Sequence, residues 1–131
     1  ASGTASARDS KNMYSVQDAL TGELGQSSLQ DDIQFFFGTG NHPAIKKTIG
    51  SYTSNKKTNG VNKSDEVACE RAFLSAMISF RDRARKEGGT AVVNLTSYYK
   101  KNVVSSTTEF ECGSGALMSG VTLRGDVVTL N

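Results

Sequence analysis

The chain has 131 residues, of which 37% are hydrophobic and 21% charged, and its formal net charge at pH 7 is +2. This length suits one domain with a buried core of its own. A charge this small gives no reason to expect nucleic acid as the partner. No apolar run approaches the ~18–20 residues that a membrane-spanning helix needs.

The N-terminal end is predicted to be a flexible tail, residues 1–12, followed by a single domain over residues 13–131. The tail consists mainly of small polar residues without hydrophobic periodicity. It lacks the basic and apolar regions of a signal peptide, so it fits a mature N-terminus left after processing, a cloning remnant or a simple tail. A short helix is expected over residues 14–20, where Ser15 and Asp18 have nearly the spacing and chemistry of a capping box.

Two strands are expected in the next part of the chain. Residues 33–37 contain three consecutive phenylalanines, which predict a strand that is buried on both faces or has a covered edge. Residues 46–57 are rich in β-branched side chains and predict a strand near an edge, with Gly50 as a possible bulge. Lysines at both ends of this strand would discourage pairing with another chain.

The strongest pattern predicts one long amphipathic helix over residues 65–87. Ser64 is a suitable N-cap, acidic residues follow it, and Gly88 can supply the left-handed residue that ends the helix. Apolar side chains recur at steps of three and four, so they share one face. At 1.5 Å per residue the helix would be ~34 Å long, and we expect it to pack along its length. The apolar face comprises Cys69, Phe73, Ala76, Met77, Phe80 and Ala84.

Three further strands are expected after the helix, over residues 91–95, 103–112 and 116–130, the last as one bent strand or as two. Short turns join them, which favours antiparallel pairing. We therefore predict an α+β fold: an antiparallel sheet of about four to five strands, the long helix packed on one face, and a short N-terminal helix.

The two cysteines are Cys69, on the predicted helix, and Cys112, at the end of a predicted strand. Without C-x-x-C spacing they make a poor thiol-redox motif, and with a single histidine they make a poor zinc site. We interpret them as a structural disulfide, which would suit an oxidising compartment. Two reduced, buried thiols in a cytosolic protein stay an alternative. No metal or other cofactor is expected.

The single histidine, His42, lies in a polar turn and could act as a general base or a ligand. No nucleophile or second ligand is evident beside it, so a loop histidine positioned by Pro43 is the simpler interpretation. The acidic residues form no clear acid–base pair. We predict no catalytic residue, and we expect a binding protein rather than an enzyme.

Basic pairs close to tyrosines predict a surface for an anion or a partner, because such patches can bind anionic polymers. The alternative is an ordinary charged surface that protects sheet edges and keeps the protein soluble. A second basic group lies late in the long helix, at Arg81, Arg83, Arg85 and Lys86. The residues of the predicted surface are Lys46, Lys47, Lys56, Lys57, Tyr98, Tyr99, Lys100 and Lys101.

Five segments resemble a family of small exported bacterial proteins, many of which carry the automatic label "excinuclease ATPase subunit". The segments are DIQFFFG, HPAIKKTIG, NKKTNGVNKSDEVACERAFLSA, RARKEGGTAVVNL and TEFECGSGALMSGVTLRGDVV. The resemblance spans residues 32–130 and includes the spacing of the cysteines. More distantly, the helix and the strand after it are similar to the YbjQ-like superfamily, near which the envelope-stress sensor lipoprotein of the Rcs phosphorelay belongs.

The resemblance implies an exported protein, periplasmic or secreted, whose signal peptide has been removed. We reject the ATPase activity of the label, because the chain has no G-x-x-x-x-G-K-S/T loop to cradle phosphates. We expect a non-enzymatic binding or envelope-associated module whose partner is an unknown protein or envelope component. Two alternatives stay open: a hydrolase with an unrecognised site near His42, and a self-assembling YbjQ-like oligomer.

Overall fold

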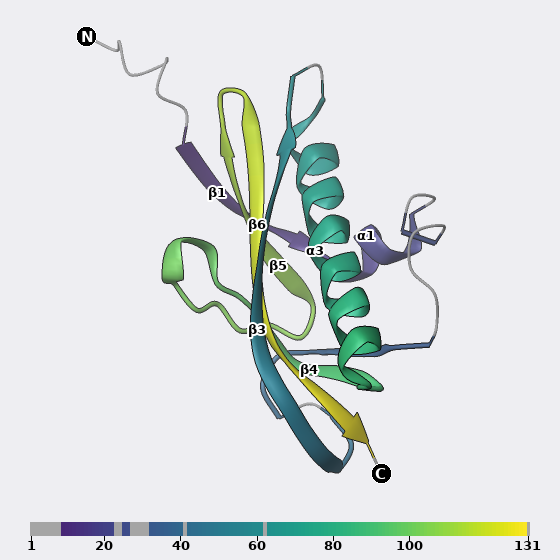
Figure 1. Cartoon of the computed structure of the whole chain (residues 1–131). Helices are drawn as coiled ribbons and strands as arrows, with labels where there is room; N and C mark the ends of the chain where they lie inside the picture. The colour runs from purple at the N-terminus through teal and green to yellow at the C-terminus, as the bar shows by residue number, and fades with distance from the viewer. Residues whose placement is uncertain (1–8, 23–24, 27–31, 41, 62, 131) are drawn as a thin grey trace, which may run out of the picture.

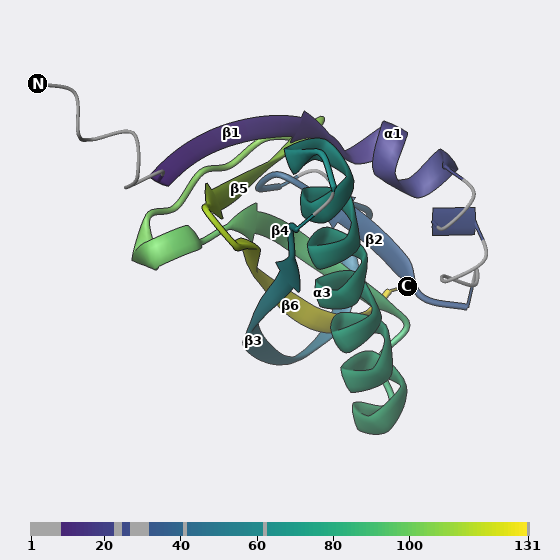
Figure 2. The same cartoon turned by 90° about the horizontal axis from the view of Figure 1, so that it is seen from above.

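The computed structural model describes residues 9–22, 25–26, 32–40, 42–61 and 63–130. Within these residues, a strongly curled six-stranded sheet carries one long helix on one face (Figures 1 and 2). The elements in chain order are β1 (Asp9–Ser15), α1 (Val16–Thr21), β2 (Gln34–Phe37), β3 (Ile45–Asn59), α3 (Asp65–Glu87), β4 (Ala91–Ser97), the 3-10 turn η2 (Tyr99–Lys101), β5 (Glu109–Gly115) and β6 (Met118–Leu130).

The prediction of an antiparallel sheet with about four to five strands is wrong, because the sheet has six strands and is mixed. The strand order is β1-β5-β6-β4-β2, and β3 pairs along the other edge of β6. Strand β2 runs parallel to β4. The chain passes through β3 and α3 between these two strands, so their connection is a crossover and not a hairpin. The broader α+β class holds.

Residues 9–12, which the sequence places in the flexible tail, belong to strand β1. This strand pairs antiparallel with β5, from Asp9 opposite Gly115 to Ser15 opposite Glu109. Backbone hydrogen bonds hold this edge strand, and they form whatever the side chains are. The polar sequence of β1 therefore shows no hydrophobic periodicity that would predict a strand. The first eight residues of the predicted tail lie outside the described residues.

Helices α1 and α3 begin directly after the serine caps that the sequence indicates. The Ser15 side chain accepts a hydrogen bond from the backbone N–H of Asp18, and Ser64 accepts one from Val67. Gly88 ends α3 in the left-handed conformation, with φ 81°. Helix α1 begins two residues later than predicted, because the residues before it belong to β1.

The main core lies between α3 and the face of the sheet that the helix covers. Phe73 is at its centre. The Phe73 ring stacks on the Phe110 ring, with their centroids 4.2 Å apart, and its centroid lies 5.9 Å from that of Phe37. The predicted disulfide is present: Cys69 and Cys112 are bonded, with Cα atoms 5.9 Å apart, and both are fully buried. The bond therefore ties the first turns of α3 to the middle of β5.

A smaller apolar cluster covers the opposite face of the sheet near the C-terminal end of β6. It explains the three phenylalanines of β2, because Phe37 joins the main core and Phe36 packs on the other face. The cluster comprises Ala91, Val93 and Val128, with Phe36, Ile45 and Leu130 packed against them.

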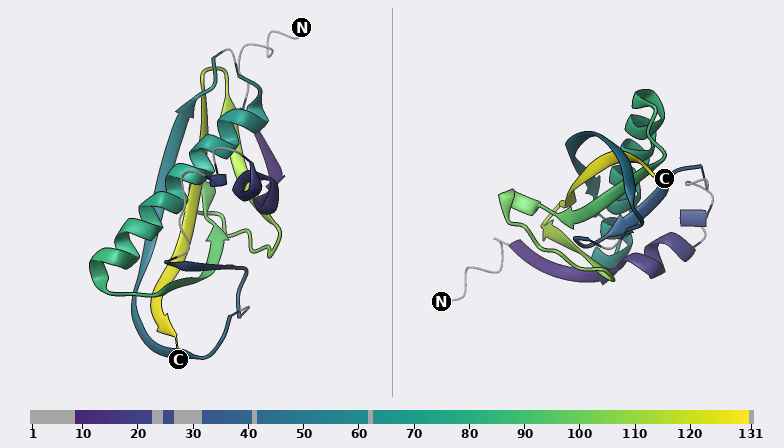
Figure 3. Two further views of the ribbon diagram at one scale, coloured as in Figure 1. Left: turned by 90° about the vertical axis from the view of Figure 1, so that its right-hand side faces the viewer. Right: turned by 90° about the horizontal axis from the view of Figure 1, so that it is seen from below.

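Strand β3 lies at an edge of the sheet, as predicted, and runs beside β6 along the length of the molecule (Figures 1 and 3). Its register shifts between Thr48 and Gly50, which confirms the predicted bulge, and it shifts once more near Ile45. From Gly50 to Asn59 the pairing with β6 is unbroken. Among the described residues, no other strand pairs with β3.

Candidate functional site

A shallow groove of about 560 Å³ lies between α3 and strand β3, and we call it the α3–β3 groove. Most of its lining comes from α3, at positions three or four residues apart, which places these side chains on one flank of the helix. This flank lies beside the buried apolar face of the helix. The lining residues are Lys56, Ser75, Ile78, Ser79, Asp82, Arg83 and Lys86.

A smaller recess of about 60 Å³ is also lined by Ser79 and Arg83 and reaches the strand at Ser54. The Ser54 side chain is 7% exposed, and its hydroxyl has no hydrogen-bond partner among the described residues. An unpaired buried hydroxyl costs about 1–3 kcal/mol. A polar group that enters this recess can therefore bind to Ser54.

Arg83 is held at the junction of the groove and the recess. Its guanidinium carbon lies 4.6 Å from the centre of the Tyr52 ring, and Nη1 lies 3.4 Å from a carboxylate oxygen of Glu87. The aromatic face orients the planar guanidinium. Both contacts leave part of the five-donor fork available to a bound carboxylate.

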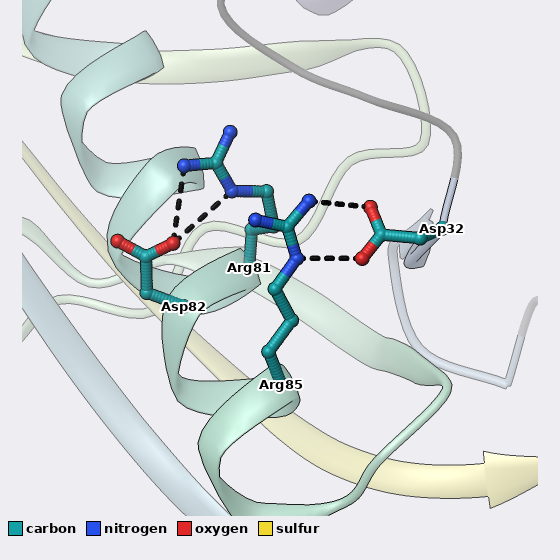
Figure 4. Close-up of polar contacts among 4 residues, drawn as sticks. All are labelled: Asp32, Arg81, Asp82 and Arg85. Atoms are coloured by element: carbon teal, nitrogen blue, oxygen red, sulfur yellow. Dashed lines mark hydrogen bonds and ion pairs between the residues drawn. The ribbon is translucent and has the colours of Figure 1, made fainter.

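The other charges make the groove positive. Lys56 and Lys86 are exposed, and neither has an ion-pair partner within the described part of the chain. Asp82 is the acidic residue of the lining, and Arg81 donates to it with Nε and Nη2, each at 3.1 Å (Figure 4). Arg81 therefore offsets the negative charge of Asp82.

The basic group late in α3 is divided between two flanks of the helix. Arg85 donates two hydrogen bonds to Asp32, at 2.5 and 2.7 Å (Figure 4), whereas Arg83 and Lys86 line the groove. These hydrogen bonds and the charge of Arg85 hold the pKa of the Asp32 carboxyl below its usual value. The contribution of this interaction to the stability of the fold is fully present above the ordinary aspartate pKa. It is lost as the pH falls through the lowered pKa of Asp32.

The predicted anion-binding residues do not form one surface. Lys56 lines the α3–β3 groove, whereas the next residue, Lys57, points to the opposite face of the sheet, as alternation along a strand requires. There Lys57 and Tyr99 both lie against Gly120. Lys46 and Lys47 lie near the other end of β3.

The tyrosines cover the sheet on the face opposite α3. Tyr99 packs so closely over Gly113 that a Cβ atom there would lie 2.2 Å from its ring. The Arg124 guanidinium carbon lies 5.4 Å from the centre of the Tyr98 ring, and Lys100 Nζ lies 5.7 Å from that of Tyr99. Lys101 follows in the same turn and is exposed. Both rings are thus engaged within the protein itself.

His42 lies in the loop before β3, with Nδ1 2.8 Å from the carbonyl oxygen of Pro43. This contact fixes the ring against its own loop, in agreement with a histidine positioned by Pro43. The suggested hydrolase site near His42 stays a prediction.

Asn94 is a structural residue whose role no sequence motif indicates. It has a left-handed backbone, φ 56°, at a register shift in β4. Its side chain accepts a hydrogen bond from Gly40 N (2.9 Å) and donates one to Asp126 Oδ2 (3.0 Å), while Ser51 donates to Asp126 Oδ1 (2.5 Å). The available signal was a polar asparagine within the apolar run AVVNL. Asparagine adopts the left-handed backbone conformation more readily than the valines and leucine around it.

Replacing Asn94 by alanine should lower the free energy of unfolding by about 2–3 kcal/mol, because two hydrogen bonds are lost and alanine is strained at positive φ. Asn94→Gly is the matched control, since it loses the same hydrogen bonds without the strain, and its loss should be smaller. Urea unfolding followed by circular dichroism measures both. Equal losses for the two variants would contradict the role of the backbone conformation.

Two further observations bear on the class of site. Within the described part of the chain, no group of three or more His, Cys, Asp or Glu side chains is placed to hold a metal ion. None of the helices there has the length and apolar character needed to cross a membrane.

No protein-family model, curated protein or solved structure matches this chain. The resemblance to the exported family and to the YbjQ-like superfamily therefore stays a prediction.

Proposed function

We propose that this protein is a non-enzymatic binding module that holds an anionic partner in the α3–β3 groove. The observation that carries the proposal is the cationic lining at Lys56, Arg83 and Lys86, beside the buried, unpartnered hydroxyl of Ser54. Positive groups in a concave surface attract anions over a distance and orient them on arrival. The hydroxyl adds a hydrogen-bond donor that a simple charged surface lacks.

The shape of the groove suits part of a larger partner. Sites for small molecules are usually enclosed and bury most of the ligand. The α3–β3 groove is widely open to solvent, and the recess at Ser54 is smaller and less open. An elongated anionic group could lie along the groove and place one polar atom in the recess.

We also propose that the protein works outside the cytoplasm, in the periplasm or as a secreted protein. The Cys69–Cys112 disulfide supports this location, because such bonds persist in oxidising compartments. The sequence resemblance to exported bacterial proteins points the same way. The partner would then be a protein or another component of the cell envelope.

Reversing two charges of the groove, in Lys56→Glu/Arg83→Glu, should weaken binding of polyglutamate or dextran sulfate by roughly tenfold or more at low salt. Each reversal turns an attraction into a repulsion in the lining. Fluorescence anisotropy of the labelled polyanion measures the affinity, and circular dichroism checks the fold of each variant.

The matched control is Lys100→Glu/Lys101→Glu, which changes the net charge by the same amount at the exposed turn η2. This control should bind nearly as well as the unchanged protein. If it loses binding while the groove variant keeps it, the anion site lies at η2. If the chain alone sediments as a larger oligomer with rising concentration, the self-assembling alternative gains support.

A further inference from the structure

We infer that the partner is an acidic protein segment in extended conformation, which adds to the open edge of β3 as a further strand and places side chains in the α3–β3 groove. This inference rests on the proposed function, because it names the class of partner that the same groove receives. Strand addition to a sheet edge is a general mode of peptide recognition, in which backbone hydrogen bonds supply affinity and alternate side chains supply specificity.

The first support is the backbone of β3. The strand has 15 residues, and among the described strands only β6 pairs with it. Successive residues of a β-strand direct their backbone groups to opposite edges, so about half of those in β3 face away from β6. The stretch from Gly50 to Asn59, which includes Ser54 and Lys56 of the groove and its recess, keeps an unbroken register. It is therefore regular enough to act as a template.

The second support is the position of the groove relative to that edge. In Figure 1, β3 runs in front of β6 with α3 alongside, and Figure 2 shows β3 on the outside of the curled sheet. An added strand would lie about 4.8 Å beyond β3. Every second side chain would then point to the α3 side of the sheet, where Lys56, Arg83 and Lys86 line the groove.

The third support is charge. Open strand edges tend to pair with one another, and lysines on the edge oppose this because two copies would bring like charges together. Lys46 and Lys47 lie near one end of β3, and Lys56 and Lys57 lie near the other. A strand that carries Glu or Asp is attracted to this edge, because its carboxylates can pair with these lysines. The same residues thus reject a second copy and accept an acidic segment.

The recess gives one position of the added strand a specific role. A carboxylate that reaches it meets the Arg83 guanidinium, which Tyr52 holds in place, and the unpartnered hydroxyl of Ser54. Charge-assisted hydrogen bonds of this kind are stronger than those between neutral groups. Other polyanions could bind the lysines, but only a polypeptide also offers N–H and C=O groups at the spacing of the β3 backbone.

The test uses the full chain and three synthetic peptides of about eight residues, a usual strand length. The first alternates Glu with Thr, the second has the same sequence with N-methyl groups on alternate residues, and the third has Lys in place of Glu. Calorimetry measures affinity, and hydrogen exchange by NMR measures protection of the β3 amides.

We expect the acidic peptide to bind and to slow exchange at alternate amides between residues 50 and 59. The N-methylated peptide should bind roughly tenfold or more weakly, because it cannot complete the backbone hydrogen bonds. The lysine peptide should not bind. The variant Lys56→Glu/Arg83→Glu should bind the acidic peptide more weakly. The control variant Lys100→Glu/Lys101→Glu should bind it as the unchanged protein does.

Three outcomes would overturn the inference. If both acidic peptides bind equally, depend on Lys56 and Arg83, and leave β3 amides unprotected, the groove binds anions without strand addition and the proposed function stands. If binding of the acidic peptides, of polyglutamate and of dextran sulfate is unaffected by the groove substitutions, the proposed function fails as well. If β3 amides become protected in a concentration-dependent dimer without peptide, the occupant of the edge is a second copy.

Discussion

Replacing both cysteines, in Cys69→Ala/Cys112→Ala, should lower the free energy of unfolding by about 4 kcal/mol. The two residues lie 43 positions apart, so the bond restricts a long loop of the unfolded chain. This loop contains most of α3 together with β4 and η2. Loss of the disulfide restores conformational freedom to the unfolded chain. A disulfide exerts most of its effect on stability by restricting that unfolded state. Both sulfurs are fully buried, so small cavities would add to the loss.

Urea unfolding of the oxidised protein, the reduced protein and the double variant measures this effect. Reduction alone should account for most of the loss, which separates the bond from the cavities. Thiol titration of the unreduced protein in denaturant should find no free thiol. Two titratable thiols, or a loss below about 1 kcal/mol, would show that the bond does not form or does not stabilise the fold.

Replacing Phe73 by alanine should cost about 3–5 kcal/mol of stability, the range found when a buried aromatic ring is removed. The Phe73 side chain is fully buried, stacked on Phe110 and close to Phe37. It therefore joins α3 to strands β5 and β2 at once. A cavity at this point removes contacts from three elements that are distant in sequence.

The matched control is Val67→Ala in the same helix, where the side chain is 41% exposed. Its cost should stay below roughly 0.5–1 kcal/mol, because little apolar area is buried there. Urea unfolding of both variants, followed by circular dichroism, gives the comparison. Similar losses at Phe73 and Val67 would contradict the assignment of Phe73 to the centre of the core.

Features that depend on neighbours in sequence were predictable. Ser64 and Gly88 mark the ends of α3 because capping uses backbone groups within a few residues. The apolar periodicity indicated the buried face of the same helix and with it the burial of Cys69. In each case the local pattern and the tertiary structure favour the same conformation.

Strand pairing was less predictable, because it depends on partners far along the chain. The polar sequence of β1 gave no sign of its pairing with β5. Residues 103–108 are rich in β-branched side chains, yet only Val104 there forms a bridge, with Ser97, and β5 begins at Glu109. β-Propensity reflects packing against neighbours, and the sequence alone does not supply those neighbours.

The groove shows the same limit. Lys56 and Lys57 form one basic pair in the sequence, but the strand directs them to opposite faces. Ser54 had no signal of its own, since an unpartnered hydroxyl becomes visible only when α3 and β3 come together. The candidate site thus arises from the register of one strand and the rotation of one helix.

The central place of β6 has a consequence for biosynthesis. Strands β3, β4 and β5 all pair with β6, which occupies residues 118–130. A chain that grows from its N-terminus cannot complete this sheet until β6 has been made. Until then its strand edges are unpaired, and such edges attract chaperones or other nascent chains. The synthesis of β6, and not the earlier synthesis of α3, therefore sets the earliest moment at which this sheet can form.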